Sequence, residues 1–207
     1  MEWSTMKIEE VTANGKLMEA FDATLEAWSC ALDMRDRTAK GHTQRVTKLA
    51  VTLASLMGVP DQELGDIRRG AILHDFGNIT VPESILHKKG ELTVDEWITI
   101  HIHPYSAYEL LGHIEFLQPA LEIPYRHHEH WDGSGYPKGL KGEEIPLAAR
   151  IFSVVDVFDS LTSERPYRSA WGKDETIQYI EDMAGKLFDP KVVHAFLSMI
   201  RGDDNVD

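Results

Sequence analysis

Apolar residues recur with helical spacing along most of the chain. Near the N-terminus, steps of three and four residues predict an amphipathic helix over about residues 16–35, and its apolar stripe consists of Met18, Phe21, Leu25, Trp28 and Leu32. The stripe covers two heptads, fewer than the three or more that support a coiled coil. We therefore expect it to pack on the core of its own chain, with a dimer or linker helix as the alternative.

The same pattern predicts further helices, with turn residues between them. Gly58 and Pro60 end one helix, Thr93 with Glu96 forms a capping box that starts another, and Pro104 forces a bend. Four glycines and two prolines make residues 132–146 a loop. No strand pattern longer than a short hairpin is found. The predicted fold class is all-α, a helical bundle with helices over residues 43–57, 61–74, 93–104, 114–125, 146–163, 174 onward and 190–200.

The expected domain organisation is simple. Residues 1–32 form an N-terminal amphipathic or linker helix, residues 33–200 form one domain, and residues 201–207 form a disordered tail. A chain of 207 residues is long enough to bury a core without disulfides.

Composition and charge exclude several classes of protein. The 21 Lys and Arg residues against 34 Asp and Glu residues leave a net charge of −13, which disfavours binding to nucleic-acid polymers and, at first sight, to any phosphate ligand. No apolar run is long enough to span a membrane and no secretory leader is found, so we expect a cytoplasmic protein. The single cysteine, Cys30, cannot form an internal disulfide and leaves no thiolate metal site.

The histidines indicate a metal site. There are ten, and each alone is more often a surface or core histidine than a ligand. Asp75 and Asp156 lie in apolar helical segments, where a buried carboxylate needs a cation, a metal or a proton. A salt bridge to Arg150 or Arg165 would satisfy Asp156, but a shared metal also explains the histidines. Imidazoles and carboxylates without thiols are typical ligands of Mn, Fe, Zn or Ni.

Several motifs together resemble the HD-GYP subgroup of the HD phosphohydrolases. The similarity runs from about Asp33 to Phe196, and the segment from His127 to Pro146 is the most specific part. The motifs are His42-Thr-Gln-Arg-Val, His74-Asp75-Phe-Gly, His103-Pro, His127-His128-Glu-His-Trp-Asp-Gly-Ser-Gly-Tyr136-Pro, Ala-Arg-Ile with Asp156, and Arg165-Pro-Tyr-Arg168.

The resemblance implies an all-helical, metal-dependent phosphodiesterase. It would hydrolyse cyclic di-GMP or a related cyclic dinucleotide to the linear dinucleotide, and to GMP as a further product, through a hydroxide that bridges two metal ions. Iron or manganese is expected first, with zinc, nickel or magnesium as alternatives. His74 and Asp75 are the implied catalytic residues, and Asp75 would bridge the ions. The implied ligands are His42, His74, Asp75 and Asp156 for one ion, and Asp75, His103, His127 and His128 for the other.

The resemblance also implies substrate contacts. Tyr136 would line the nucleotide pocket, and a plain surface turn is the alternative for its loop. Arg165 and Arg168 would bind phosphate through their guanidinium groups, a role compatible with ion pairs to Asp156 or Asp159. Asp159 would accept a hydrogen bond from a guanine edge.

Two residues depart from the family pattern. Asn78 stands where the family usually has a lysine that touches a substrate phosphate, which removes a charge from that contact. Thr38 stands where members with three metals have a glutamate, so we expect two ions.

Two functions therefore remain open from the sequence. The first is the cyclic-dinucleotide phosphodiesterase. The second is a metal-bound but catalytically weak module that senses the nucleotide or docks a diguanylate cyclase (GGDEF) domain through the Gly-Tyr-Pro loop; an HD phosphohydrolase acting on another nucleotide is a further alternative. A homodimer through the N-terminal helix would fit either. The negative charge does not exclude a small cyclic dinucleotide, because metals and arginines would form a local positive pocket.

Overall fold

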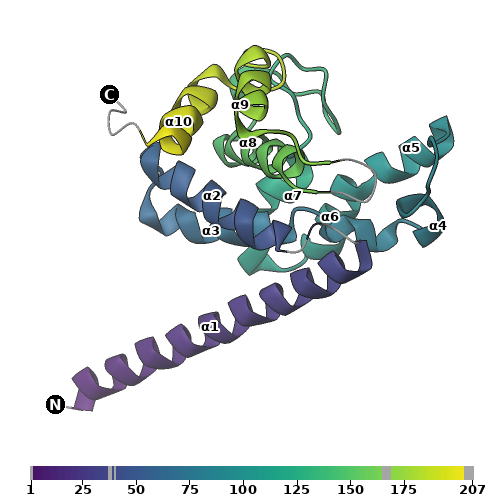
Figure 1. Ribbon diagram of the computed structural model, residues 1–207. Coiled ribbons are helices and arrows are strands. Elements are labelled where there is room, and N and C mark those ends of the chain that lie inside the picture. Colours follow the sequence, from purple (N-terminus) through teal and green to yellow (C-terminus); the bar gives the residue numbers. More distant parts are fainter. Residues whose placement is uncertain (1, 37–38, 40, 165–168, 203–207) are drawn as a thin grey trace.

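The computed structural model describes residues 2–36, 39, 41–164 and 169–202, with side chains from residue 15 onward, and its fold is all-α (Figure 1). Within these residues no β-strand is found. Short 3-10 helices, η1 (Phe76–Thr80), η2 (Glu115–Leu121) and η3 (Gly142–Glu144), lie between the α-helices. These are α1 (Glu2–Asp36), α2 (His42–Leu56), α3 (Asp61–Leu73), α4 (Glu83–Leu86), α5 (Val94–His101), α6 (His103–Leu111), α7 (Glu122–Arg126), α8 (Leu147–Thr162), α9 (Lys173–Asp182) and α10 (Pro190–Arg201).

The main hydrophobic core forms around α8. Ile151, Phe152 and Val154 are fully buried, because this helix is apolar on almost every side. Val46 of α2 and Phe196 of α10 pack into the same cluster. A helix that is apolar all round is stable only when other helices surround it, so α8 forms the centre of the bundle, and any polar side chain on it needs a partner.

The long helix α1 packs on the bundle with its second half. In Figure 1 it runs along one side of the molecule, and its N-terminal part extends beyond the other helices. Leu25 is fully buried and Phe21 packs beside it in a smaller cluster with Leu73, Leu111 and Leu117. These contacts agree with packing on the chain's own core. The alternative of a dimer through this helix stays a prediction.

Most predicted helix boundaries agree with the structure to within a few residues. Thr93 and Glu96 form the capping box at the start of α5, and Pro104 lies in the first turn of α6. Two expectations were wrong. The first helix begins at Glu2 instead of near residue 16, and residues 114–125 do not form one helix: η2 is a 3-10 helix that contains Pro119, and α7 follows it. A proline removes an amide donor, which favours such a break.

None of the helices in the described part of the chain combines the length and the apolar character that a bilayer crossing requires.

Replacing Leu25 with Ala tests the packing of α1. Because Leu25 is fully buried, the Leu25→Ala variant should lower the free energy of unfolding by about 2–5 kcal/mol. Leu17, on the same helix, is 66% exposed, so Leu17→Ala should change it by less than about 0.5 kcal/mol. Urea unfolding followed by circular dichroism measures both. Equal effects of the two substitutions would contradict this packing.

Candidate metal centre

The structure brings together the side chains that the sequence predicts as metal ligands. Most come from helix ends: the first residues of α2 and α6, and the residues that follow α3 and α7. Asp156 alone lies inside a helix, the central α8. Two groups form, and within each group the potential ligand atoms lie within 4.8 Å of one another. The first group is His42, His74 and Asp156, and the second is His103, His127 and His128.

The carboxylate of Asp75 lies between the two groups. Its Oδ2 atom is 3.3 Å from Nε2 of His74 in the first group. Its Oδ1 atom is 3.6 Å from Nε2 of His103 and 4.0 Å from Nε2 of His127 in the second. The two groups also approach each other through the rings of His74 and His127, whose centroids are 5.6 Å apart. One side chain therefore offers a separate oxygen to each group.

Hydrogen bonds to main-chain carbonyls orient three of the imidazoles. Nδ1 of His74 lies 2.9 Å from the carbonyl oxygen of Ala71. His103 and His127 make the equivalent bonds to the carbonyls of Ile100 and Ile123, at 2.8 and 3.0 Å. A carbonyl oxygen only accepts, so Nδ1 is the donor and Nε2 is the nitrogen left to bind a metal ion. This is the arrangement that metal-binding histidines require.

His42 is oriented by a carboxylate instead. Its Nδ1 atom lies 2.7 Å from Oδ2 of Asp159, while its Nε2 atom is 3.4 Å from Oδ1 of Asp156. Arg45 donates to both oxygens of Asp159, from Nε at 2.5 Å and from Nη2 at 2.9 Å. Asp159 is only 3% exposed. Arg45 belongs to the His-Thr-Gln-Arg motif, but nothing in the sequence predicted this partner.

The buried groups differ in charge state. Burial opposes protonation of His42, but its bonds to Asp156 and Asp159 outweigh burial and raise the pKa of the imidazole to about 10. For His128, burial first and the neighbouring His103 next lower the pKa to about 3. Burial also opposes ionisation of Asp75, yet the charge of His74 outweighs it and holds the pKa of this carboxyl well below its usual range. The first group thus carries a proton at neutral pH, whereas His128 is neutral.

Gly77 explains why a glycine follows His74-Asp75. A Cβ atom at this position would lie 1.8 Å from the carbonyl oxygen of His103 and 2.9 Å from the amide nitrogen of Ala107. Both are backbone atoms of α6, so neither can move aside as a side chain could. The missing Cβ lets α6 approach η1 closely and brings His103 to Asp75.

The Gly-Tyr-Pro loop is attached to the site by Glu129, which sequence reasoning did not assign. This residue is 2% exposed, and its carboxylate accepts hydrogen bonds from the amides of Lys138 and Leu140, at 2.7 and 2.9 Å. At Gly135 a Cβ atom would lie 2.3–2.6 Å from backbone atoms of residues 128–130. Its position directly after the histidine pair was the available signal for Glu129.

Tyr136 lies within a stack of aromatic rings at the edge of the site. Its ring stacks on His128, with centroids 4.7 Å apart, and on His101, with centroids 4.1 Å apart. Burial raises the pKa of its phenol above the usual range, so the phenol stays protonated at neutral pH. The loop is therefore packed against the second group, which disagrees with the alternative of a plain surface turn.

Of the other predicted substrate contacts, the structure describes Asn78 and Asp159, and both bond to other side chains of the chain. Asn78 is buried, and its Nδ2 atom donates to Oδ2 of Asp36 at 3.1 Å. Asp159 is engaged by His42 and Arg45, so the structure does not place it as a free acceptor for a guanine edge. Arg165, Arg168 and Thr38 lie outside the described residues.

Asp156 does not form the salt bridge to Arg150 that was considered from the sequence. Arg150 pairs with Asp189, with Nη1 and Oδ2 2.6 Å apart, and Asp189 caps α10. Among the described residues Asp156 instead faces His42.

In this helical bundle, histidines and aspartates, most of them at helix ends, surround one shared carboxylate. This arrangement defines a class of helical domain that could hold metal ions. The family model described as the HD domain matches residues 26–192. The chain belongs to the HD domain family, in its HD-GYP subgroup.

Among curated proteins, the chain is 44% identical to the cyclic di-GMP phosphodiesterase response regulator of Xanthomonas campestris, over 84% of this chain and 47% of that protein. It is 40% identical to a cyclic di-GMP phosphodiesterase of Thermotoga maritima, over 84% of this chain and 48% of that protein. It is 38% identical to the 3'3'-cGAMP-specific phosphodiesterase 2 of Vibrio cholerae, over 81% of this chain and 32% of that protein. The chain thus spans between about a third and a half of these relatives.

Solved structures show the same fold. A cyclic GMP-AMP-specific phosphodiesterase of Vibrio cholerae superposes with a TM-score of 0.63 at 23% identity, over 87% of this chain and 48% of that one. An HD-GYP protein of Bdellovibrio bacteriovorus superposes with a TM-score of 0.60 at 21% identity, over 78% of this chain and 52% of that one.

Binding of Mn²⁺ should release protons. An ion on Nε2 of His42 must displace the proton held there, because the pKa of about 10 keeps this imidazole protonated at pH 7. We expect release of at least about one proton per chain at pH 7, since Asp75 outweighs burial and also raises the pKa of His74, and an affinity that increases as the pH rises toward 10. Calorimetry in buffers of different ionisation enthalpy measures the release. His42→Ala should reduce it, and His194→Ala, at an exposed position of α10, should not. Binding without proton release would contradict this charge state.

Proposed function

We propose that this chain is a metal-dependent phosphodiesterase that hydrolyses a cyclic dinucleotide, with cyclic di-GMP as the first candidate, to the linear dinucleotide. The observation that carries the proposal is the placement of Asp75, with one oxygen toward each group of ligand atoms. The names of the relatives supply the substrate class, since they are cyclic di-GMP and 3'3'-cGAMP phosphodiesterases.

The donor set fits divalent metal ions. Buried Nε2 atoms with fixed orientations and carboxylates without thiols suit Fe, Mn, Zn or Ni. The first ion would be held by His42, His74, Asp75 and Asp156, and the second by Asp75, His103, His127 and His128. Two bound ions would lower the pKa of a water and neutralise the charge of a phosphoryl group.

The residues of the chain act mainly by orientation. Asp75 fixes the two groups relative to each other, and its lowered pKa keeps it ionised at neutral pH. Asp159 and Arg45 hold the ring of His42 in place, so we assign Asp159 a positioning role instead of a guanine contact. Glu129 holds the Gly-Tyr-Pro loop, which keeps Tyr136 beside His128 at the edge where a nucleotide would approach.

The phosphates of the substrate also require positive charge from the protein. We retain Arg165 and Arg168 for this role, because a guanidinium group matches the geometry of phosphate oxygens. Both follow α8, the helix that carries Asp156. The net charge of −13 makes such local cations necessary.

A second candidate function is a catalytically weak module that senses the nucleotide or docks a diguanylate cyclase domain. One observation favours it: the amide of Asn78 is occupied by Asp36, so position 78 supplies no cation to a phosphate. The hydrolase remains the better supported function, because every predicted ligand is present and the described ligand atoms converge.

The first experiment incubates Mn-loaded protein with cyclic di-GMP or 3'3'-cGAMP and follows products by chromatography. We expect conversion to the linear dinucleotide. Asp75→Asn should abolish both turnover and binding of the second ion, because one side chain serves both groups. Asp95→Asn, at an exposed position in the first turn of α5, is the matched control and should retain activity. Metal-loaded protein that turns over neither nucleotide would overturn the hydrolase and favour the weak module.

Restoring a cation at position 78 should increase activity. In Asn78→Lys the ammonium group would lie near Asp36, which is close to Asp75, and could contact a substrate phosphate. We expect kcat/KM to rise about tenfold, the size of one charge-assisted hydrogen bond. Asn78→Met, which has similar length and no charge, should lower or not change it. An increase of the same size in Asn78→Met would show that the charge is not responsible.

A further inference from the structure

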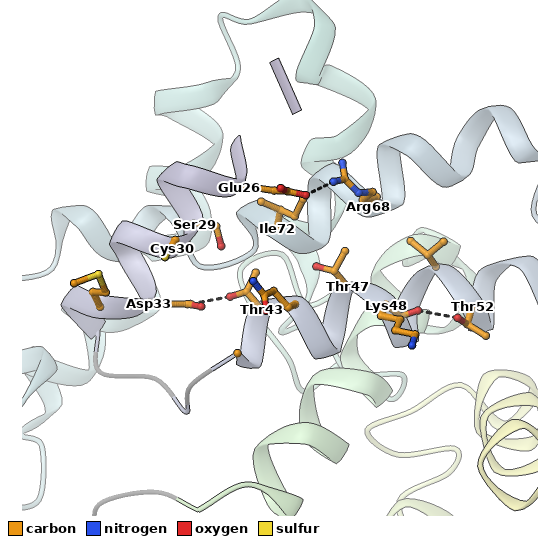
Figure 2. A pocket seen from close by; sticks show the side chains of 14 residues that line it. Glu26, Ser29, Cys30, Asp33, Thr43, Thr47, Lys48, Thr52, Arg68 and Ile72 are labelled. Carbon is orange, nitrogen blue, oxygen red and sulfur yellow. Dashed lines mark hydrogen bonds and ion pairs between the residues drawn. The ribbon is translucent and has the colours of Figure 1, made fainter. Parts of the chain in front are cut away.

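A cleft of about 1130 Å³ lies between α1 and α2, with one end formed by α3 (Figure 2). This volume is slightly above the usual range of small-molecule sites, roughly 300–1,000 Å³. It lies on the outer side of α2, and none of the predicted metal ligands lines it. The residues that matter for its chemistry are Ser29, Cys30 and Met34 of α1, Thr47 and Val51 of α2, and Ile72 of α3.

The hydroxyl group of Thr47 indicates that the cleft binds a ligand. Thr47 is 8% exposed, and its Oγ1 atom has no hydrogen-bond partner in the described part of the chain. Helical threonines elsewhere in the molecule donate to the carbonyl four residues earlier; Thr24, Thr52, Thr99 and Thr162 do so at 2.7–2.9 Å. Thr47 does not, and Figure 2 shows its side chain extending from α2 toward α1. A buried hydroxyl without a partner is costly and uncommon.

A second hydroxyl lies on the opposite wall. Ser29 of α1 is 6% exposed and lines the same cleft. Thr47 and Ser29 therefore place a hydroxyl-bearing side chain on each of the two walls of one cleft, and the hydroxyl of Thr47 is buried without a partner among the described residues. A single molecule between the walls could bond to both.

The other residues that line the cleft indicate the chemical character of the rest of the ligand. Met34, Val51 and Ile72 offer apolar surface. Glu26, Asp33, Lys48 and Arg68 supply two charges of each sign at the rim, so their formal charges cancel. Of these, Arg68 already pairs with Glu26, and Asp33 accepts a hydrogen bond from Thr43. An uncharged body suits this lining better than an ion.

We propose that the cleft is a binding site for an uncharged amphipathic small molecule, with an apolar body and a polar group that bonds to Thr47 and Ser29. The site is separate from the proposed catalytic centre, and its test does not depend on activity.

The cleft is connected to the start of α2. Oγ1 of Thr43 donates to Oδ1 of Asp33 at 2.7 Å, which joins the two walls beside His42. A ligand that moves the walls relative to each other would act on this bond. Occupancy of the cleft is therefore coupled to the position of His42.

The probe for this site is N-phenyl-1-naphthylamine, an uncharged dye with one N–H donor whose fluorescence increases in apolar surroundings. We expect saturable binding of about one dye per chain. Thr47→Val keeps the shape but removes the hydroxyl, so the dye should bind about fivefold more weakly while the fold is retained. Thr99→Val, on α5, removes a hydroxyl that is already bonded and should leave binding unchanged.

Blocking the cleft provides an independent test. Val51→Trp should reduce dye affinity at least about tenfold by filling the space. Because Val51→Trp also changes the packing of α2, the folded protein is in addition labelled at Cys30, the single cysteine, with N-benzylmaleimide, which should have the same effect. Dye binding that persists after labelling would overturn the proposal. The absence of saturable dye binding would also overturn it. Loss of dye binding as the protein self-associates would overturn it too, because a second copy of the chain would then be the occupant of the cleft.

Hydrogen exchange tests the coupling. Saturation with the dye should change the exchange rate of the amides at residues 42–46 by about threefold or more, and leave those of α10 unchanged. Unchanged exchange at residues 42–46 would overturn the coupling to His42.

Discussion

The site depends on one constraint: the two oxygens of Asp75 must face different groups of histidines at the same time. His74 approaches one oxygen and His103 the other, at 3.3 and 3.6 Å. His74 follows α3 and His103 begins α6, and η1, which follows Asp75, can approach α6 this closely only because Gly77 has no side chain. A backbone contact thus sets the distance between the two groups, and backbone contacts deform less easily than side chains do.

The orientation of the imidazoles is mostly local. His74, His103 and His127 each bond to a carbonyl three or four residues earlier in the chain. Such a bond forms when the helical turn forms, so each ring is positioned before the groups assemble. His42 is different, because the first residue of α2 has no preceding helical turn; Asp159, held by Arg45, replaces the carbonyl. That support crosses from α8 to α2 and depends on the complete fold.

Periodicity and capping predicted most of the helices, because each depends on a few neighbouring residues. The ligand set followed from motifs, and the structure brings these residues together. Partners across elements were not predictable: neither Asp159 against His42 nor Asn78 against Asp36 leaves a local signal in the sequence. The same holds for the cleft, which depends on the separation of α1 and α2. The start of the first helix at Glu2 was missed because residues 2–15 lack the apolar spacing that marks its second half.

The sequence predicts a helix of residues 1–32 that is separate from the domain that follows, whereas α1 runs without a break to Asp36, and the end of this helix supports the site directly. Arg35 donates to the carbonyl oxygens of Asn78 and Val81, at 2.8 and 2.6 Å, and Asp36 accepts from the side chain of Asn78. These bonds hold η1, the segment that follows Asp75. Since α1 is one continuous helix, a shift anywhere in its packed half reaches η1 through Arg35. The end of α1 is therefore structurally part of the candidate metal centre. The same helix connects the cleft on one of its sides to the segment that follows Asp75.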